Sequence, residues 1–144
     1  MNHVVGFLNE QVADWNLLFV KLHNFHWNVK GPDFFTLHEK FEELYDEAAG
    51  YIDEIAERVL ALGGVPAGSL KEYLALTTLQ EATGKETPRE MTEAVVADLK
   101  ATVANLKRGL DLADEAGDVT TDDLLTGIHS ALEKHIWLLS AFLG

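Results

Sequence analysis

Apolar residues recur along most of this chain at intervals of three and four positions, which is the period of an amphipathic α-helix. Four long segments show this pattern, and no segment shows the strict alternation that is typical of a β-strand. They cover approximately residues 3–29, 33–62, 88–115 and 121–143. The pattern therefore predicts an all-α protein with four long helices.

Capping and turn residues stand at the ends of these segments. Gly31-Pro32 should end the first helix, and Gly63-Gly64 followed by Pro66 should end the second. Thr87-Pro88-Arg89-Glu90 combines a capping box with proline at the first helical position, which favours a helix start. Gly117 should end the third helix, and we expect Thr120 or Thr121 to cap the fourth.

The connection between the second and third helices is long enough to cross over along the length of a bundle. It holds a short predicted helix after Ser69, where Ser-Leu-Lys-Glu forms a capping box. The leucines of this helix exceed what an exposed turn or two needs, so we expect a partner to cover it. Short turns elsewhere and one crossover predict a ferritin-like four-helix bundle, with residues 1–144 forming a single domain.

Charge and composition narrow the class of function. The formal net charge is −13, which should repel a nucleic-acid phosphate backbone. The chain has no cysteine, which fits a reducing cytosol, and it shows neither a signal-peptide pattern nor a membrane-spanning apolar run. We therefore expect a cytoplasmic protein without disulfide or thiolate chemistry, whose acidic excess attracts cations.

The second helix carries an acidic stripe beside its core-facing stripe. His38 and Glu42 are four residues apart, as are Asp53 and Glu57, so each pair shares a helix face. Eleven residues separate Glu42 from Asp53, which leaves about 20° of net rotation and a distance of roughly 16 Å along the axis. The two pairs lie on one face but cannot bind the same metal ion from one chain.

His26 adds a second imidazole to this pattern. If the first two helices fold back across Gly31-Pro32, His26 and His38 come level with each other. Two interpretations then remain: unrelated polar pairs on a solvated face, or two half-sites that a twofold-related copy completes. Imidazole and carboxylate ligands together suit iron, manganese or zinc.

The segment HNFHWNVKGPDFFTLHEKFEELYDEAAGYIDEIAER, together with LEKHIWLLSAFL near the end, strongly resembles the Dps family of mini-ferritins. The resemblance implies a ferroxidase site shared between twofold-related subunits. One chain would supply His26, His38 and Glu42, and its neighbour would supply Asp53 and Glu57. Trp27 matches an aromatic residue that lies close to the diiron site in the family, so we expect it to take part in redox chemistry.

The resemblance also implies a hollow shell of twelve identical subunits with acidic pores. Asp118 and Asp123 fall near the pore positions of the family, although acids here could equally serve the dipole of the last helix. DNA-compacting members use lysine-rich tails. We see none at either end of this sequence, so we expect no direct DNA binding.

The function that this resemblance implies is iron storage and detoxification. Two Fe²⁺ ions per site would be oxidised, with hydrogen peroxide preferred over dioxygen, and stored as a ferric oxide-hydroxide core. Such a ferroxidase protects against oxidative stress because it consumes peroxide and Fe²⁺ together. The alternative is a protein that protects DNA mainly by binding and compacting it.

Overall fold

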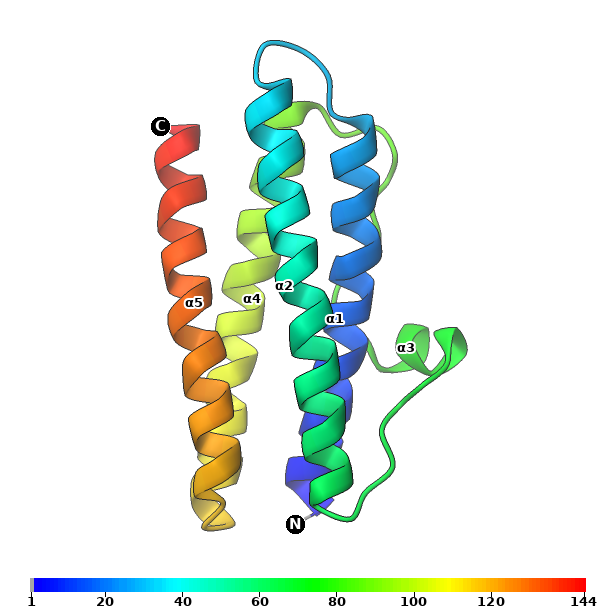
Figure 1. Ribbon diagram of the computed structural model, residues 1–144, viewed down its shortest axis with the longest axis vertical. Coiled ribbons are helices and arrows are strands. Elements are labelled where there is room, and N and C mark those ends of the chain that lie inside the picture. Colours follow the sequence, from blue (N-terminus) through cyan, green and yellow to red (C-terminus); the bar gives the residue numbers. More distant parts are fainter. Residues whose placement is uncertain (1) are drawn as a thin grey trace. The chain divides into compact units, whose positions relative to one another are not determined.

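The computed structural model describes residues 2–144, and five helices account for the regular structure of these residues (Figure 1). The helices are α1 (Asn2–Asn28), α2 (Phe34–Ala61), α3 (Leu70–Leu76), α4 (Pro88–Glu115) and α5 (Val119–Leu143). No strand occurs within residues 2–144. The prediction of four long helices and one short helix in the long connection is confirmed.

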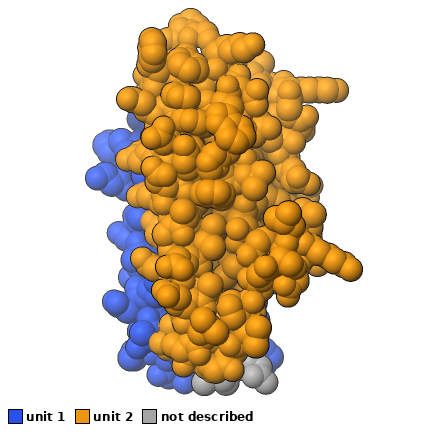
Figure 2. Space-filling model, turned by 45° about the vertical axis from the view of Figure 1, so that its right-hand side comes forward, with its two compact units in different colours: residues 1–7, 92–144 blue, residues 8–91 orange. Residues whose placement is uncertain are grey.

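The chain divides into two compact units, coloured separately in Figure 2. One unit spans residues 8–91 and the other combines residues 1–7 with residues 92–144. None of the helices is long and apolar enough to cross a membrane, as judged over the described part of the chain.

Residues 8–91 contain an antiparallel hairpin of α1 and α2. Aromatic contacts join the two helices at two levels: Phe25 and Phe41 lie 5.8 Å apart, and Trp15 and Tyr51 lie 4.8 Å apart between ring centres. The core face of α2 is buried as its period predicts, at Leu37, Phe41, Leu44, Ala48, Ile55 and Val59. The hairpin therefore aligns the end of α1 with the beginning of α2.

Helix α2 ends in a Schellman motif, as the glycine pair predicts. Gly63 has a positive φ of 86°, the Gly63 N–H donates to the Leu60 carbonyl, and the Gly64 N–H donates to the Val59 carbonyl. These bonds supply donors to two of the carbonyls that have no hydrogen-bond partner at a helix end.

Hydrogen bonds of two buried side chains of α1, Asp14 and Lys21, hold the connection after α2 against this helix. The Asp14 carboxylate is fully buried and accepts bonds from the Thr77 hydroxyl, the Thr78 N–H and the Thr78 hydroxyl at 2.6, 2.7 and 2.7 Å. The Lys21 ammonium donates to the Gln80 carbonyl at 2.8 Å. This part of the connection is therefore fixed without a regular element of its own.

Helix α3 starts at the predicted capping box. The Ser69 hydroxyl accepts from the Glu72 N–H at 3.2 Å, and the Glu72 carboxylate accepts from the Gly68 N–H. The Gly68 N–H and, next in effect, the Ser69 hydroxyl donate to the Glu72 carboxylate, and these two bonds lower the pKa of Glu72. Leu70 and Leu74 are 76% and 60% exposed, so cover by a partner stays a prediction.

The unit of residues 1–7 and 92–144, blue in Figure 2, contains the hairpin of α4 and α5, which turns at Gly117 with a φ of 65°. The start of α4 is capped as predicted by Thr87 and Glu90, which exchange bonds of 2.9 and 3.1 Å. The prediction that Thr120 or Thr121 caps α5 is wrong. Asp118 is the cap, because its carboxylate accepts from both the N–H and the hydroxyl of Thr121.

Candidate metal centre

The α1–α2 hairpin brings His26 and His38 face to face. Their rings stack at 3.7 Å with 11° between the planes, and both residues lie in the unit of residues 8–91. His26 is 7% exposed and His38 is half-buried. The expectation that folding across Gly31-Pro32 sets the two histidines level is confirmed.

Each of the two histidines is oriented by the backbone of the other. The His26 Nδ1 lies 2.7 Å from the His38 carbonyl oxygen, and the His38 Nδ1 lies 2.7 Å from the His26 carbonyl oxygen. A carbonyl oxygen only accepts, so each Nδ1 carries the hydrogen and donates it. The neutral tautomer leaves each Nε2 with a free lone pair, which is the form that ligates a metal.

Glu42 completes a group of three potential ligands. One Glu42 carboxylate oxygen lies 3.8 Å from the His26 Nε2, and one ligand atom from each of the three residues lies within 4.8 Å of the other two. Within residues 3–144 this is the one group of three or more such side chains that could surround a metal ion. Donors that converge in this way fit a divalent transition-metal ion such as iron, manganese or zinc.

Asp53 and Glu57 do not join this group within the chain. Both are exposed and lie on α2 towards its C-terminal end. Their spacing from Glu42 places Asp53 roughly 16 Å and Glu57 roughly 22 Å further along the helix axis. Two imidazoles and Glu42 therefore form one group, and Asp53 and Glu57 form a separate exposed pair further along α2; that the two belong to one shared metal site stays a prediction.

Tyr45, an aromatic residue that the sequence pattern did not indicate, lies beside the histidines. The Tyr45 ring meets His26 edge-on at 5.3 Å and stacks on His23 at 3.7 Å. Burial raises the pKa of Tyr45, and the charges of Glu42 and Asp46 raise it further, so the phenol is neutral at physiological pH. The spacing could have predicted that Tyr45 lies on the helix face of His38. Tyr45 follows His38 by seven residues, which is about two helical turns.

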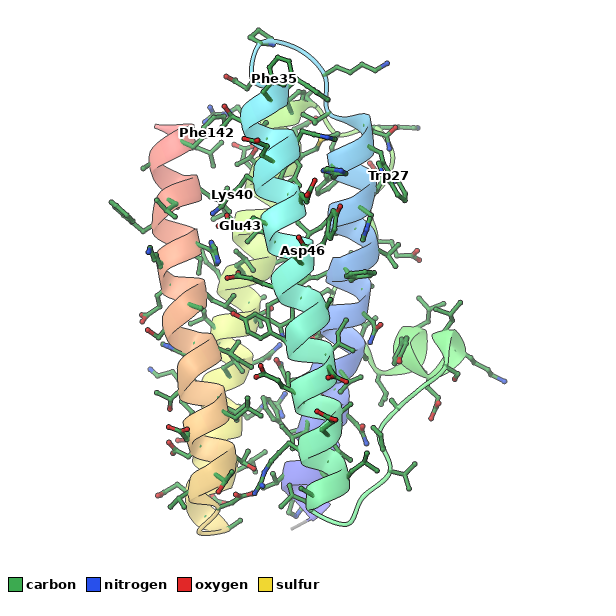
Figure 3. All side chains as sticks on the ribbon, viewed as in Figure 1. Trp27, Phe35, Lys40, Glu43, Asp46 and Phe142 are labelled. Carbon is green, nitrogen blue, oxygen red and sulfur yellow. The ribbon has the colours of Figure 1, made fainter. Side chains whose placement is uncertain are left out.

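Trp27 follows His26 but does not share its buried position. Its side chain is 69% exposed and projects from the end of α1, as the label in Figure 3 shows. The ring contacts His23, with 5.2 Å between ring centres. Its role in redox chemistry stays a prediction.

The two predicted pore residues lie at the start of the last helix. The Asp118 carboxylate is engaged as the cap of α5, and Asp123 is exposed in the first turns of that helix. This cap fits the interpretation in which Asp118 serves the end of the helix, and its place in a pore stays a prediction.

Comparison with known proteins gives the family. The Ferritin family, described as a ferritin-like domain, matches residues 5–144. DNA protection during starvation protein 2 of Bacillus anthracis is 57% identical over 141 residues, which cover 98% of this chain and 97% of that protein.

Solved structures agree with this match. A Dps protein from Bacillus brevis has a TM-score of 0.98 and 55% identity, covering 99% of this chain and 96% of that chain. Dps from Listeria innocua soaked with zinc has a TM-score of 0.95 and 42% identity, covering 98% of this chain and 96% of that chain. The chain has an all-α ferritin-like fold and belongs to the Dps family.

Proposed function

We propose that this protein is an iron-storage ferroxidase whose diiron sites form between twofold-related copies. The observation that carries the proposal is the group of His26, His38 and Glu42, in which both imidazoles already present Nε2. Iron is the substrate here, first bound as Fe²⁺ and then released inward as Fe³⁺. Family membership supports the same activity.

The second half of the proposed site comes from the partner copy. A twofold axis near the middle of α2 sets two such helices antiparallel, so that the histidine half of one chain faces Asp53 and Glu57 of the other. Each site then combines two neutral imidazoles with three carboxylates. This donor set favours Fe²⁺ and still binds Fe³⁺, because carboxylate oxygens suit the harder ion.

Hydrogen peroxide is the oxidant that we propose. Two Fe²⁺ ions give up one electron each, and these two electrons reduce one peroxide to two hydroxide ions. No hydroxyl radical is released when both electrons arrive together. The ferric ions then enter the cavity of a twelve-subunit shell, where the acidic excess of −13 per chain favours a ferric mineral core.

A complementation experiment tests both the activity and the sharing of the site. Anaerobic Fe²⁺ is added to the wild type, to His26→Ala and to Asp53→Ala, followed by stoichiometric peroxide, and ferric absorbance is recorded. Glu54→Ala is the matched control, because Glu54 is an exposed carboxylate next to Asp53 but about 100° round the helix.

We expect rapid oxidation in the wild type and in the control, and its loss in both site variants. Refolding the two site variants together should restore about a quarter of the sites, since a working site needs one intact half from each chain. Equal rates in all four proteins would mean that the stripe is only a charged face.

A further inference from the structure

A phenylalanine ring covers the face of His38 that is turned away from His26. The Phe34 and His38 rings stack at 4.7 Å between ring centres with 21° between the planes, and His38 stacks on His26 at 3.7 Å with 11°. Two rings this close and this nearly parallel to His38 would overlap if they shared one of its faces, so they cover opposite faces. His38 therefore lies between its fellow ligand and a phenyl group.

The start of α2 sets this stack through helix geometry. Phe34 and His38 are four residues apart, and side chains at this spacing lie one above the other. Helical side chains lean towards the N-terminus, so the His38 ring leans back onto Phe34. The Phe34 N–H donates to the Gly31 carbonyl at 3.1 Å, and Gly31 takes a φ of 107° in that turn. The turn that sets the histidines level therefore also fixes the backbone of Phe34.

The rotation of the His38 imidazole is limited by its neighbours. The χ2 torsion of histidine has only a broad, two-fold preference of its own. The His38 Nδ1 donates to the His26 carbonyl at 2.7 Å, which holds one edge of the ring but still allows it to rock about that bond. Rocking would push one face into His26 and the other into Phe34. With both faces covered, the His38 Nε2 keeps one direction, in the group that Glu42 completes.

We propose that Phe34 is a positioning residue that holds the His38 imidazole for metal binding and stabilises it once the metal is bound. The inference rests on the proposed function. A bound divalent ion withdraws electron density from the imidazole, and the negative face of a phenyl ring favours a more positive neighbour. The stack is therefore stronger with the metal bound than without it, and this difference raises the metal affinity of the half-site.

Two substitutions of Phe34 separate this role from simple packing. Phe34→Leu keeps an apolar side chain at the start of α2 but removes the flat ring face, whereas Phe34→Tyr keeps that face and adds one oxygen at the edge of a half-buried ring. If Phe34 only packs against the hairpin, these variants change the free energy of unfolding and leave the metal affinity unchanged. If it positions His38, only the variant without a ring loses affinity.

The next residue offers a matched control. Phe35 is 79% exposed at the start of α2, where Figure 3 labels it, and its ring meets Phe34 edge-on at 5.4 Å. Phe35→Leu therefore makes the same chemical change one position away from the stack. Phe34→Met also lacks a flat ring but has a longer side chain, and it serves in place of Phe34→Leu if that variant does not fold.

The first experiment titrates the metal-free proteins with Co²⁺, whose visible absorption reports the ligands and geometry of its site. Calorimetry of the same proteins gives the Kd. A stacked ring is worth about a two- to tenfold change in Kd, so Phe34→Leu should weaken Co²⁺ binding by that factor and alter the absorption spectrum. Phe34→Tyr and Phe35→Leu should bind Co²⁺ as the wild type does.

His26→Ala separates the failure of this inference from the failure of the proposed function. If the Co²⁺ spectrum of the wild type is unchanged in His26→Ala, the histidines bind no metal and the proposed function fails. If His26→Ala loses that spectrum while Phe34→Leu keeps the wild-type Kd and spectrum, the positioning role of Phe34 is refuted. Equal weakening in Phe34→Leu and Phe34→Tyr would also refute it, because only one of them lacks the ring.

A second experiment needs no metal. Crystal structures of the metal-free wild type and of metal-free Phe34→Leu show the orientation of the His38 ring directly. We expect one orientation in the wild type, with the His38 Nδ1 about 2.7 Å from the His26 carbonyl oxygen, and a rotated ring or two orientations in Phe34→Leu. The same single orientation in both proteins would show that Phe34 does not fix the ring.

Discussion

Adding one methyl group at Gly109 should reveal how tightly the start of α1 packs on α4. A Cβ atom at this position would lie 2.2, 2.5 and 2.8 Å from the Cε2, Cζ and Cδ2 atoms of Phe7. The Phe7 ring is 3% exposed, and the Arg108 guanidinium lies 5.1 Å from its centre. The ring therefore has little room to retreat, and Gly109→Ala creates a steric conflict.

The change in the free energy of unfolding caused by Gly109→Ala is the sum of two opposing effects. Glycine to alanine in a helix interior ordinarily stabilises by about 1 kcal/mol. Overpacking a buried site costs about 1–3 kcal/mol, and contacts below 3 Å with a confined ring place this site at the upper end. We expect Gly109→Ala to lower the free energy of unfolding by about 1–2 kcal/mol.

A double-mutant cycle isolates the conflict. Phe7→Val removes the ring atoms that the new methyl group would meet, so Gly109→Ala in that background should stabilise by about 1 kcal/mol. Urea midpoints of the four proteins, measured by circular dichroism at one protomer concentration, give the cycle. An equal effect of Gly109→Ala in both backgrounds would refute the packing argument.

Three further predictions concern the polar groups and the charge. Asp14→Ala should lower the free energy of unfolding by about 1.5–3 kcal/mol, because three donors of Thr77 and Thr78 lose the buried charged acceptor that they share, and Asp14→Asn should cost less in the same urea assay. Burial, followed by the charges of two nearby glutamates, raises the pKa of Tyr51 to about 12. The neutral Tyr51 phenol contributes its full stabilisation below about pH 10, and this contribution is lost as the pH rises to about 12. The urea midpoint of Tyr51→Phe should therefore fall less than that of the wild type over this range. A net charge of −13 should prevent retardation of DNA in gels even at low salt, and a shifted band that disappears as salt is raised would contradict this.

Most of the fold could be predicted because each helix boundary carries its own chemical signal. The glycine after α2 and the Thr-Pro pair before α4 act through backbone conformation and local hydrogen bonds. The start of α5 was misplaced because Asp118, Thr120 and Thr121 are all good caps, and periodicity alone fixes a boundary only to within a residue or two. That the chain forms a single domain stays a prediction.

The candidate site was predicted less completely because it depends on side-chain orientation. Spacing across the turn could set His26 and His38 level, but it could not show that each Nδ1 donates to the other residue's carbonyl. The Tyr45–His23 stack joins residues 22 positions apart on two helices, and it depends on their relative rotation. Helical period gives the face of each helix but not which rings meet.

The hydrogen bonds of the two histidines bear on why the proposed site needs a second chain. Both Nδ1 protons are committed to carbonyls, so both Nε2 lone pairs are set for a metal before one binds, which reduces the ordering cost of binding. Glu42 adds one negative charge to this half-site, which is less than two divalent ions require. Asp53 and Glu57 would add two more negative charges but lie roughly 16 and 22 Å from Glu42 along the helix axis. In the proposed dimer, twofold symmetry supplies both sites at once, so a variant that keeps every ligand but stays monomeric should bind iron weakly and oxidise it slowly.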